Sequence, residues 1–173
     1  MEVLLLTGNA AYEGCIKPRV EGLRLQDMVN SPSMTSPDLQ GNVDFLFLYD
    51  TNITIKTTDE LLNEQVERVM VSPQHVELVF EISETDVDVS TREYEKKYLG
   101  QEMVSVKILT RAKRRITGQI PRGLRVLLET ESEIRPFFAL TRVHIESDSP
   151  EQLTTDANYA LLNSRHIESI IPK

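Results

Sequence analysis

A duplication within the chain limits its fold more than any other sequence feature. Residues 69–79 comprise an apolar run, a four-residue break that ends in His75, and a second alternating run. The same pattern returns at residues 160–170, with His166 in the position of His75. We therefore expect two structural units of the same kind in tandem. The duplication alone indicates no substrate, cofactor or reaction.

Each half begins with a predicted β-hairpin. In the first half, apolar runs at residues 3–6 and 13–16 lie on either side of Gly8-Asn9. This pair favours positive φ angles and therefore a tight turn. In the second half, runs at residues 104–109 and 116–120 occupy the same places.

Two glycines lie inside the strands of these hairpins. Alignment of Thr7 with Thr110 brings Gly14 to the position of Gly118 only if the second turn contains one additional residue. A glycine within a strand usually marks a bulge or the close approach of another backbone. We expect both glycines to allow a sharp bend.

The rest of each half predicts a helical turn and three further strands. Apolar residues at 25–29 and 126–128 have spacings suited to one helical turn. The aromatic segments 45–49 and 137–140 carry apolar residues at odd and even positions, which is typical of a strand covered on both faces. The duplicated pair of strands completes each half.

Five short antiparallel strands in a unit of this size avoid exposed edges best by curling into a partly closed barrel. The expected fold class is mainly β, with two tandem five-stranded SH3-like or Sm-like barrels, each having a short helical turn after its second strand. The predicted boundaries are 1–82 for the first barrel, 83–102 for an acidic linker and 103–173 for the second barrel.

The second half resembles the Sm-like proteins. Residues 159–170 are similar to their second signature, an apolar strand, a tight polar turn and an Ile-rich strand, and residues 106–120 are similar to the first. The Asp and Asn residues that contact RNA bases in that family have no clear match, and Ser164 or Pro73 replaces the glycine of the second signature. The resemblance implies an Sm-like fold and makes RNA binding one candidate function.

The second half also resembles a bacterial family of small uncharacterised domains. Its motifs are a Thr-Gly-x-Ile strand, a Gly-x-Arg turn, a Phe-x-x-Leu-Thr strand, and a Leu-Leu-Val-Asn hairpin that ends in Ile-Pro. The corresponding segments here are 117–120, 123–125, 137–141, 161–163 and 171–172. The first half follows the pattern in outline. The resemblance implies the barrel fold and no particular activity, because the family has none assigned.

Alternation along the first strand predicts a candidate protein interface. Val3 and Leu5 take the inward positions, whereas Leu4 and Leu6 point the other way and require a cover. Either the other barrel of the same chain or a second protein molecule can supply that cover. A protein partner or self-association is therefore expected.

Charge is divided unevenly along the chain. Residues 1–82 hold 5 basic and 13 acidic side chains, whereas residues 103–173 hold 11 and 8. A basic cluster in the second half is a candidate anion or nucleic-acid patch, because Arg side chains match phosphate geometry. Its members are Arg111, Lys113, Arg114, Arg115, Arg122 and Arg125. The net charge of −8 disfavours nucleic acid, and the alternative is a solvated hairpin tip that attracts the acidic half of the chain.

No residue pattern indicates catalysis, a cofactor or a metal site. His75 and His166 repeat one position at the start of a final strand, which favours a duplicated role in a turn. His144 lies within a strand pattern, and the three histidines have no metal-binding spacing. Glu77 and Glu168 follow the repeated histidines at positions expected to be exposed. We find no phosphate-binding glycine loop, nucleophile elbow or paired-carboxylate signature.

The sequence also predicts a protein without membrane contact. No apolar stretch approaches the roughly 18–20 residues of a membrane span, and Glu2 stands where an export signal carries positive charge. Cys15 is the single cysteine, which rules out an internal disulfide. A cytoplasmic location is expected.

Two classes of function remain. The first is a non-catalytic structural or regulatory module that binds a protein through strand edges and the outward apolar face of the first half. The alternative is Sm-like RNA or nucleotide binding through the basic cluster. Phosphate binding weakens steeply with salt whereas apolar docking does not, so salt dependence separates the two.

Overall fold

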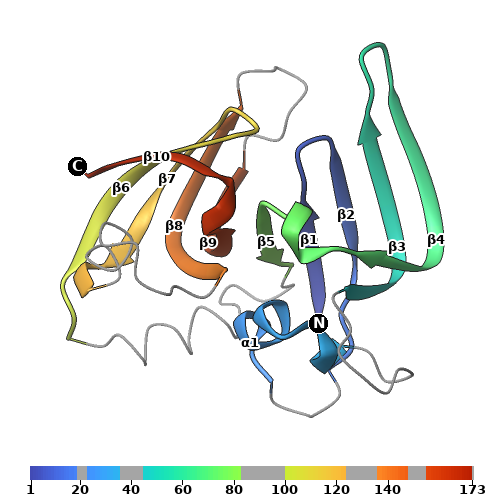
Figure 1. The fold of residues 1–173 in the computed structure, drawn as a ribbon, viewed down its shortest axis with the longest axis horizontal. Coiled ribbons are helices and arrows are strands. Elements are labelled where there is room, and N and C mark those ends of the chain that lie inside the picture. Colours follow the sequence, from blue (N-terminus) through green and yellow to red (C-terminus); the bar gives the residue numbers. More distant parts are fainter. Residues whose placement is uncertain (19–22, 36–44, 83–99, 124–135, 148–154, 173) are drawn as a thin grey trace. The chain divides into compact units, whose positions relative to one another are not determined.

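A computed structural model describes residues 1–18, 23–35, 45–82, 100–123, 136–147 and 155–172 (Figure 1). The chain divides into two compact units, Met1–Glu84 and Thr85–Lys173. Both units are mainly β and antiparallel. Residues 83–99 of the predicted linker lie outside the described residues.

The described residues of the first unit form five strands, one short helix and two 3-10 turns. Its strands follow the order β5-β1-β2-β3-β4. The elements are β1 (Glu2–Leu6), β2 (Ala10–Cys15), α1 (Leu25–Asn30), η1 (Pro32–Thr35), β3 (Leu46–Lys56), β4 (Leu61–Val71), η2 (Pro73–His75) and β5 (Leu78–Glu81).

The second unit has the corresponding strand order, β10-β6-β7-β8-β9. Its elements are β6 (Met103–Thr110), β7 (Arg114–Pro121), β8 (Phe137–Ser147), β9 (Thr155–Asn163), η3 (Ser164–His166) and β10 (Ile167–Pro172). In each unit, a four-strand meander is followed by a 3-10 turn, and the last strand returns to pair with the first.

The predicted closure into barrels is not established. In the described part of the first unit, β4 and β5 stand at opposite ends of the strand order and are not paired with each other. The same holds for β9 and β10 in the described part of the second unit. The mainly β, antiparallel character was predicted correctly, and the strand order is open in the described part of each unit.

The first hairpin has a tight turn, but its backbone differs from the prediction. Thr7 N–H donates to the Ala10 carbonyl oxygen at 2.9 Å, which leaves Gly8 and Asn9 as the two turn residues. Neither has a positive φ, so that part of the prediction was wrong. The Thr7 hydroxyl stabilises the turn instead, because it accepts from Ala10 N–H at 3.0 Å and donates to the Ala10 carbonyl at 3.1 Å.

The second hairpin contains the predicted extra turn residue. Its turn runs from Thr110 to Arg114, and Lys113 takes a left-handed conformation with a φ of 63°. Lys113 N–H donates to the Thr110 carbonyl at 2.9 Å, and the Thr110 hydroxyl accepts from Arg114 N–H at 3.2 Å. A three-residue turn with its last residue left-handed is a common hairpin connection.

The two strand glycines mark bulges, as predicted. The pairing of β2 with β3 shifts its register beside Gly14, and that of β7 with β8 shifts beside Gly118. Opposite each glycine, the neighbouring strand contains a residue with positive φ, Asp50 at 52° and Arg142 at 49°. Both β3 and β8 therefore bend at the same place.

Close backbone approach explains the glycine most clearly in the first unit. A Cβ atom added to Gly14 would lie 2.6 Å from Thr51 Oγ1 and 2.9 Å from the Tyr49 carbonyl oxygen. At Gly118 the nearest atom would be the Thr141 carbonyl oxygen at 3.3 Å. A side chain at Gly14 would thus require neighbouring atoms of β3 to shift, whereas the Gly118 position is only crowded.

The core contains the segments that the apolar pattern indicated. Helix α1 buries Leu25, Met28 and Val29, as predicted, and residues 126–128 lie outside the described residues. Residues 46–48 and 137–140 are at most 4% exposed, which agrees with strands covered on both faces. Phe45 is an exception at 42% because β3 begins one residue later. No helix within the described ranges is long and apolar enough to cross a membrane.

Candidate protein interface

The strongest candidate surface is the outer edge of β4. This strand has 11 residues and pairs with β3 from Leu61 to Val71 without a register shift. It ends the strand order of the first unit, and Figure 1 shows that the β3–β4 hairpin extends beyond the β1–β2 hairpin. An edge strand presents unpaired backbone N–H and C=O groups, which can pair with another chain.

Large apolar side chains lie on this edge in contact with solvent. Leu61, Leu62 and Met70 are 49%, 45% and 57% exposed. Val66 and Val69 are half-buried, and Val71 is the single buried residue of the strand. Edge strands are commonly protected by Pro, by charged residues, Lys above all, or by a bulge. Strand β4 has no Pro, Lys or bulge, and its charged residues are Glu64, Glu67 and Arg68. Exposed apolar side chains along a regular edge strand are typical of an interaction surface.

One face of β4 combines apolar and charged residues. Alternate positions along a strand point to the same side, so five residues of β4 share one face. Val66 lies at the centre of this face, flanked on each side first by a charged residue and then by an apolar one. From one end to the other the set is Leu62, Glu64, Val66, Arg68 and Met70. Their partners on β3 are Ile55, Ile53, Thr51, Tyr49 and Phe47.

The corresponding strand of the second unit has a different character. Residues 159–162 of β9 read Tyr-Ala-Leu-Leu and are at most 4% exposed. The matching residues of β4 are Arg68, Val69, Met70 and Val71, of which Arg68 and Met70 are exposed and Val71 alone is buried. The sequence alone signals this difference, because charged residues recur through β4 where β9 becomes apolar.

The two leucines of the predicted interface differ in exposure. Val3 and Leu5 are fully buried, as expected for inward positions. Leu4 is half-buried, but Leu6 is only 3% exposed. A charged substitution at Leu6 would therefore place a charge in the protein interior, and only Leu4 has appreciable exposed surface.

Part of the predicted basic cluster lies at the β6–β7 turn. Arg111, Lys113 and Arg115 are exposed. The Lys113 ammonium lies 2.7 Å from the Glu168 carboxylate. Arg115 faces Glu146 across the β7–β8 register, and Arg114 is buried, with 8% exposure. Acidic neighbours therefore compensate part of the positive charge at this turn.

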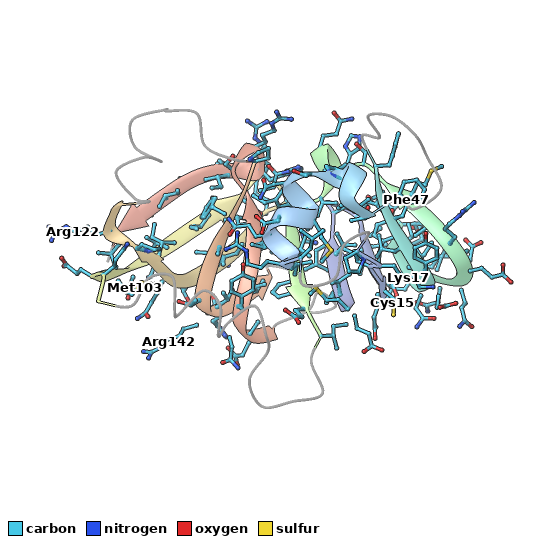
Figure 2. The ribbon with its side chains drawn as sticks, turned by 90° about the horizontal axis from the view of Figure 1, so that it is seen from below. Cys15, Lys17, Phe47, Met103, Arg122 and Arg142 are labelled. Carbon is cyan, nitrogen blue, oxygen red and sulfur yellow. The ribbon has the colours of Figure 1, made fainter. Side chains whose placement is uncertain are left out.

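The remaining members do not join that group. Arg122 follows Arg114 by eight positions along an extended strand, which places it roughly 26 Å away at the opposite end of β7. Its guanidinium pairs with the Glu102 carboxylate, and Figure 2 shows its side chain extending away from the sheet. Arg125 lies outside the described residues. The structure thus separates Arg122 from the turn cluster.

The histidines occupy two different environments. His75 and His166 end the short turns η2 and η3, and the Asn163 side chain caps the second turn by accepting from Arg165 N–H at 3.1 Å. His144 lies on the half-exposed side of β8, with its Nδ1 atom 2.6 Å from Asp156 and its Nε2 atom 3.5 Å from Glu146.

The acidic neighbours change the chemistry of His144. The hydrogen bond to Asp156 raises the pKa of the His144 imidazole above 6.5, and the charges of Asp156 and Glu146 act in the same direction. Among the described residues, no group of three or more His, Cys, Asp or Glu residues could hold a metal ion.

The repeated acids also differ from each other. Glu168 is exposed, as expected. Glu77 was wrongly expected to be exposed: it is completely buried, and its backbone N–H donates to the Leu6 carbonyl oxygen at 2.7 Å. This bond places Glu77 beside the end of β1 before β5 begins, so the alternating pattern of the last strand does not extend back to it.

No family model, curated protein or solved structure matches this chain. A functional proposal must therefore be argued from the geometry of its surfaces.

Proposed function

We propose that the chain is a non-catalytic protein-interaction module whose first unit binds an extended protein segment along β4. The main support for this proposal is that β4 is an 11-residue edge strand with three exposed large apolar side chains. In β-strand addition, main-chain hydrogen bonds supply affinity, and alternate side chains supply specificity. We also propose that the two units are tandem SH3-like or Sm-like barrels related to the bacterial domain family that the second half resembles.

The charges of β4 define the segment that fits it. Glu64 and Arg68 share a face with Leu62 and Met70. A complementary strand therefore offers apolar residues at its ends and opposite charges between them. Opposite charges directly across two strands are favourable, and like charges are unfavourable.

The alternative function, RNA or nucleotide binding, has weaker support. Lys113 and Arg122 pair with Glu168 and Glu102, and Arg122 lies at the opposite end of its strand from Arg114. A phosphate ligand would therefore compete with existing ion pairs at two separate places. Its binding would weaken steeply with ionic strength, whereas apolar strand docking would persist.

A display library of unstructured peptides tests the proposal. We expect selected peptides to bind saturably, to perturb the NMR signals of residues 61–71, and to keep their affinity at moderate salt. Leu62→Lys should lower that affinity, while Ile171→Lys should leave it unchanged because Ile171 is a comparably exposed residue, 58%, on another strand. Saturable peptide binding elsewhere, or none at concentrations at which the chain is monomeric, would contradict the proposal.

A further inference from the structure

We infer that the occupant of the β4 edge is β4 of a second copy of this chain, paired antiparallel about a two-fold axis through Val66. This inference rests on the proposed function and identifies its partner. Two-fold symmetry requires one surface to be complementary to itself. The β4 sequence satisfies that condition about its central residue.

The complementarity appears when β4 of one copy is paired antiparallel with β4 of the other. Val66 meets Val66, and Glu64 of each copy meets Arg68 of the other, which gives two opposite-charge pairs. Leu62 of each copy meets Met70 of the other, so the exposed apolar residues at the two ends of the strand cover each other. Gln65 faces Glu67, a combination that permits a hydrogen bond.

Neighbouring registers lack this match. A two-fold axis at Gln65 would place Leu62 against Arg68, and an axis at Glu67 would place that carboxylate against its own copy. Like charges across a strand pair are unfavourable and opposite charges are favourable. Of these three axes, the one through Val66 alone brings opposite charges together, so the charge pattern favours it.

The position of β4 makes this pairing accessible. The strand ends the order of its unit, and Glu64 and Arg68 are both exposed. The unshifted register with β3 keeps the edge regular over all 11 residues, or about 36 Å. In the dimer, the strands of the first unit in one copy would continue, through the β4–β4 pair, into the strands of the first unit in the other copy.

Charge reversal tests both the partner and the register. The experiment uses the full chain and measures mass by sedimentation equilibrium over a wide concentration range. Wild-type protein should show a reversible monomer–dimer equilibrium. Glu64→Arg alone, or Arg68→Glu alone, converts both ion pairs into like-charge pairs and should weaken dimerisation by about 10-fold to 100-fold.

Two rescues distinguish pairing from damage to the fold. The double variant Glu64→Arg/Arg68→Glu should recover the wild-type dimerisation constant. An equimolar mixture of the two single variants should form a heterodimer, because one chain then presents two arginines to two glutamates of the other. At a concentration at which wild type and variants are all monomeric, matching circular dichroism and melting temperature show that each single variant is folded.

Each outcome bears on the inference. A monomer at all concentrations, single variants that dimerise like wild type, or failure of both rescues would overturn it. The peptide selection distinguishes that failure from failure of the proposed function: a monomeric chain that binds peptides along residues 61–71 retains the function with another partner. A monomer that binds no peptide there contradicts both.

Discussion

The two units have the same strand order, yet their fourth strands, β4 and β9, differ in composition and exposure. Both units have a bulge at a strand glycine and a 3-10 turn that ends in histidine. The shared features lie where the backbone must bend or close a turn. Features present in one unit alone are therefore better guides to function than those that both possess.

The bulge glycines provide the sharpest comparison between the units. Gly14→Ala should destabilise the first unit by about 2–3 kcal/mol, because its Cβ would meet Thr51 Oγ1 and a backbone carbonyl closer than van der Waals contact. Gly118→Ala should cost about 1 kcal/mol, because its nearest contact is longer. Residue-resolved hydrogen exchange measures the two units separately.

Gly8→Ala is the matched control for the glycine comparison. Gly8 lies in the same unit as Gly14, and a Cβ added there would have no atom within 4 Å. Its substitution should change stability little. Equal losses at Gly14 and Gly118 would show that close approach does not distinguish the two bends.

A buried hydroxyl in the first unit predicts a stabilising substitution. Thr51 is completely buried, and its Oγ1 atom has no hydrogen-bond partner among the described residues. Val143, also buried, follows the bulge residue in the second unit as Thr51 does in the first. Thr51→Val should raise the unfolding free energy by about 1–2 kcal/mol, because it removes an uncompensated polar group.

The reverse substitution sharpens this test. Val143→Thr should destabilise the second unit by about 1–2 kcal/mol. Hydrogen exchange under mildly denaturing conditions measures both changes. Destabilisation by Thr51→Val would mean that the hydroxyl makes a favourable interaction.

Loss of the Glu168 carboxylate should have a smaller effect on the free energy of unfolding. Glu168→Gln removes the 2.7 Å pair with Lys113, but both side chains are well exposed. Water and salt screen such pairs, so the loss should be below about 1 kcal/mol. Denaturation of wild type and variant at low and high salt measures it, and a salt-independent loss would contradict a screened ion pair.

The smallest expected effect is the pH dependence of the second unit. Because the pKa of His144 is raised in the folded state, its protonated form favours folding. This contribution is fully present below the unfolded pKa of about 6.5 and is lost as pH rises through the higher folded value.

An NMR titration of the His144 imidazole checks this shift. Asp156→Asn should lower the pKa towards its ordinary value, since its hydrogen bond is the largest cause. Glu146→Gln should lower it less, because that carboxylate is 3.5 Å away compared with 2.6 Å. A larger effect from Glu146→Gln would contradict the assignment.

The sequence allowed several local features to be predicted. Fixed positions in the repeat located the glycine bulges and the extra residue in the second turn, because both features depend on local backbone geometry. The buried positions of Val3 and Leu5 followed from simple alternation. The negative φ angles at Gly8 and Asn9 escaped prediction because the Thr7 hydroxyl stabilises a different turn.

Features that depend on strand order were harder to predict. The six basic residues were grouped by their closeness in sequence, with Arg122 expected just beyond a strand, and that strand places Arg122 at the opposite end of β7 from the turn. Leu6 was expected to point outward and to need a cover, and it is buried in the fold. The edge position of β4 became evident only when its pairing with β3 was known, and its internal complementarity then gained a physical meaning.

Amide hydrogen exchange along β4 and β9 at low and high protein concentration tests the central claim most directly. We predict that outward amides of residues 61–71 become more protected as concentration rises, while those of residues 155–163 do not change. Exchange along β4 that is independent of concentration, in a range where the chain dimerises, would place the interface elsewhere and contradict the account.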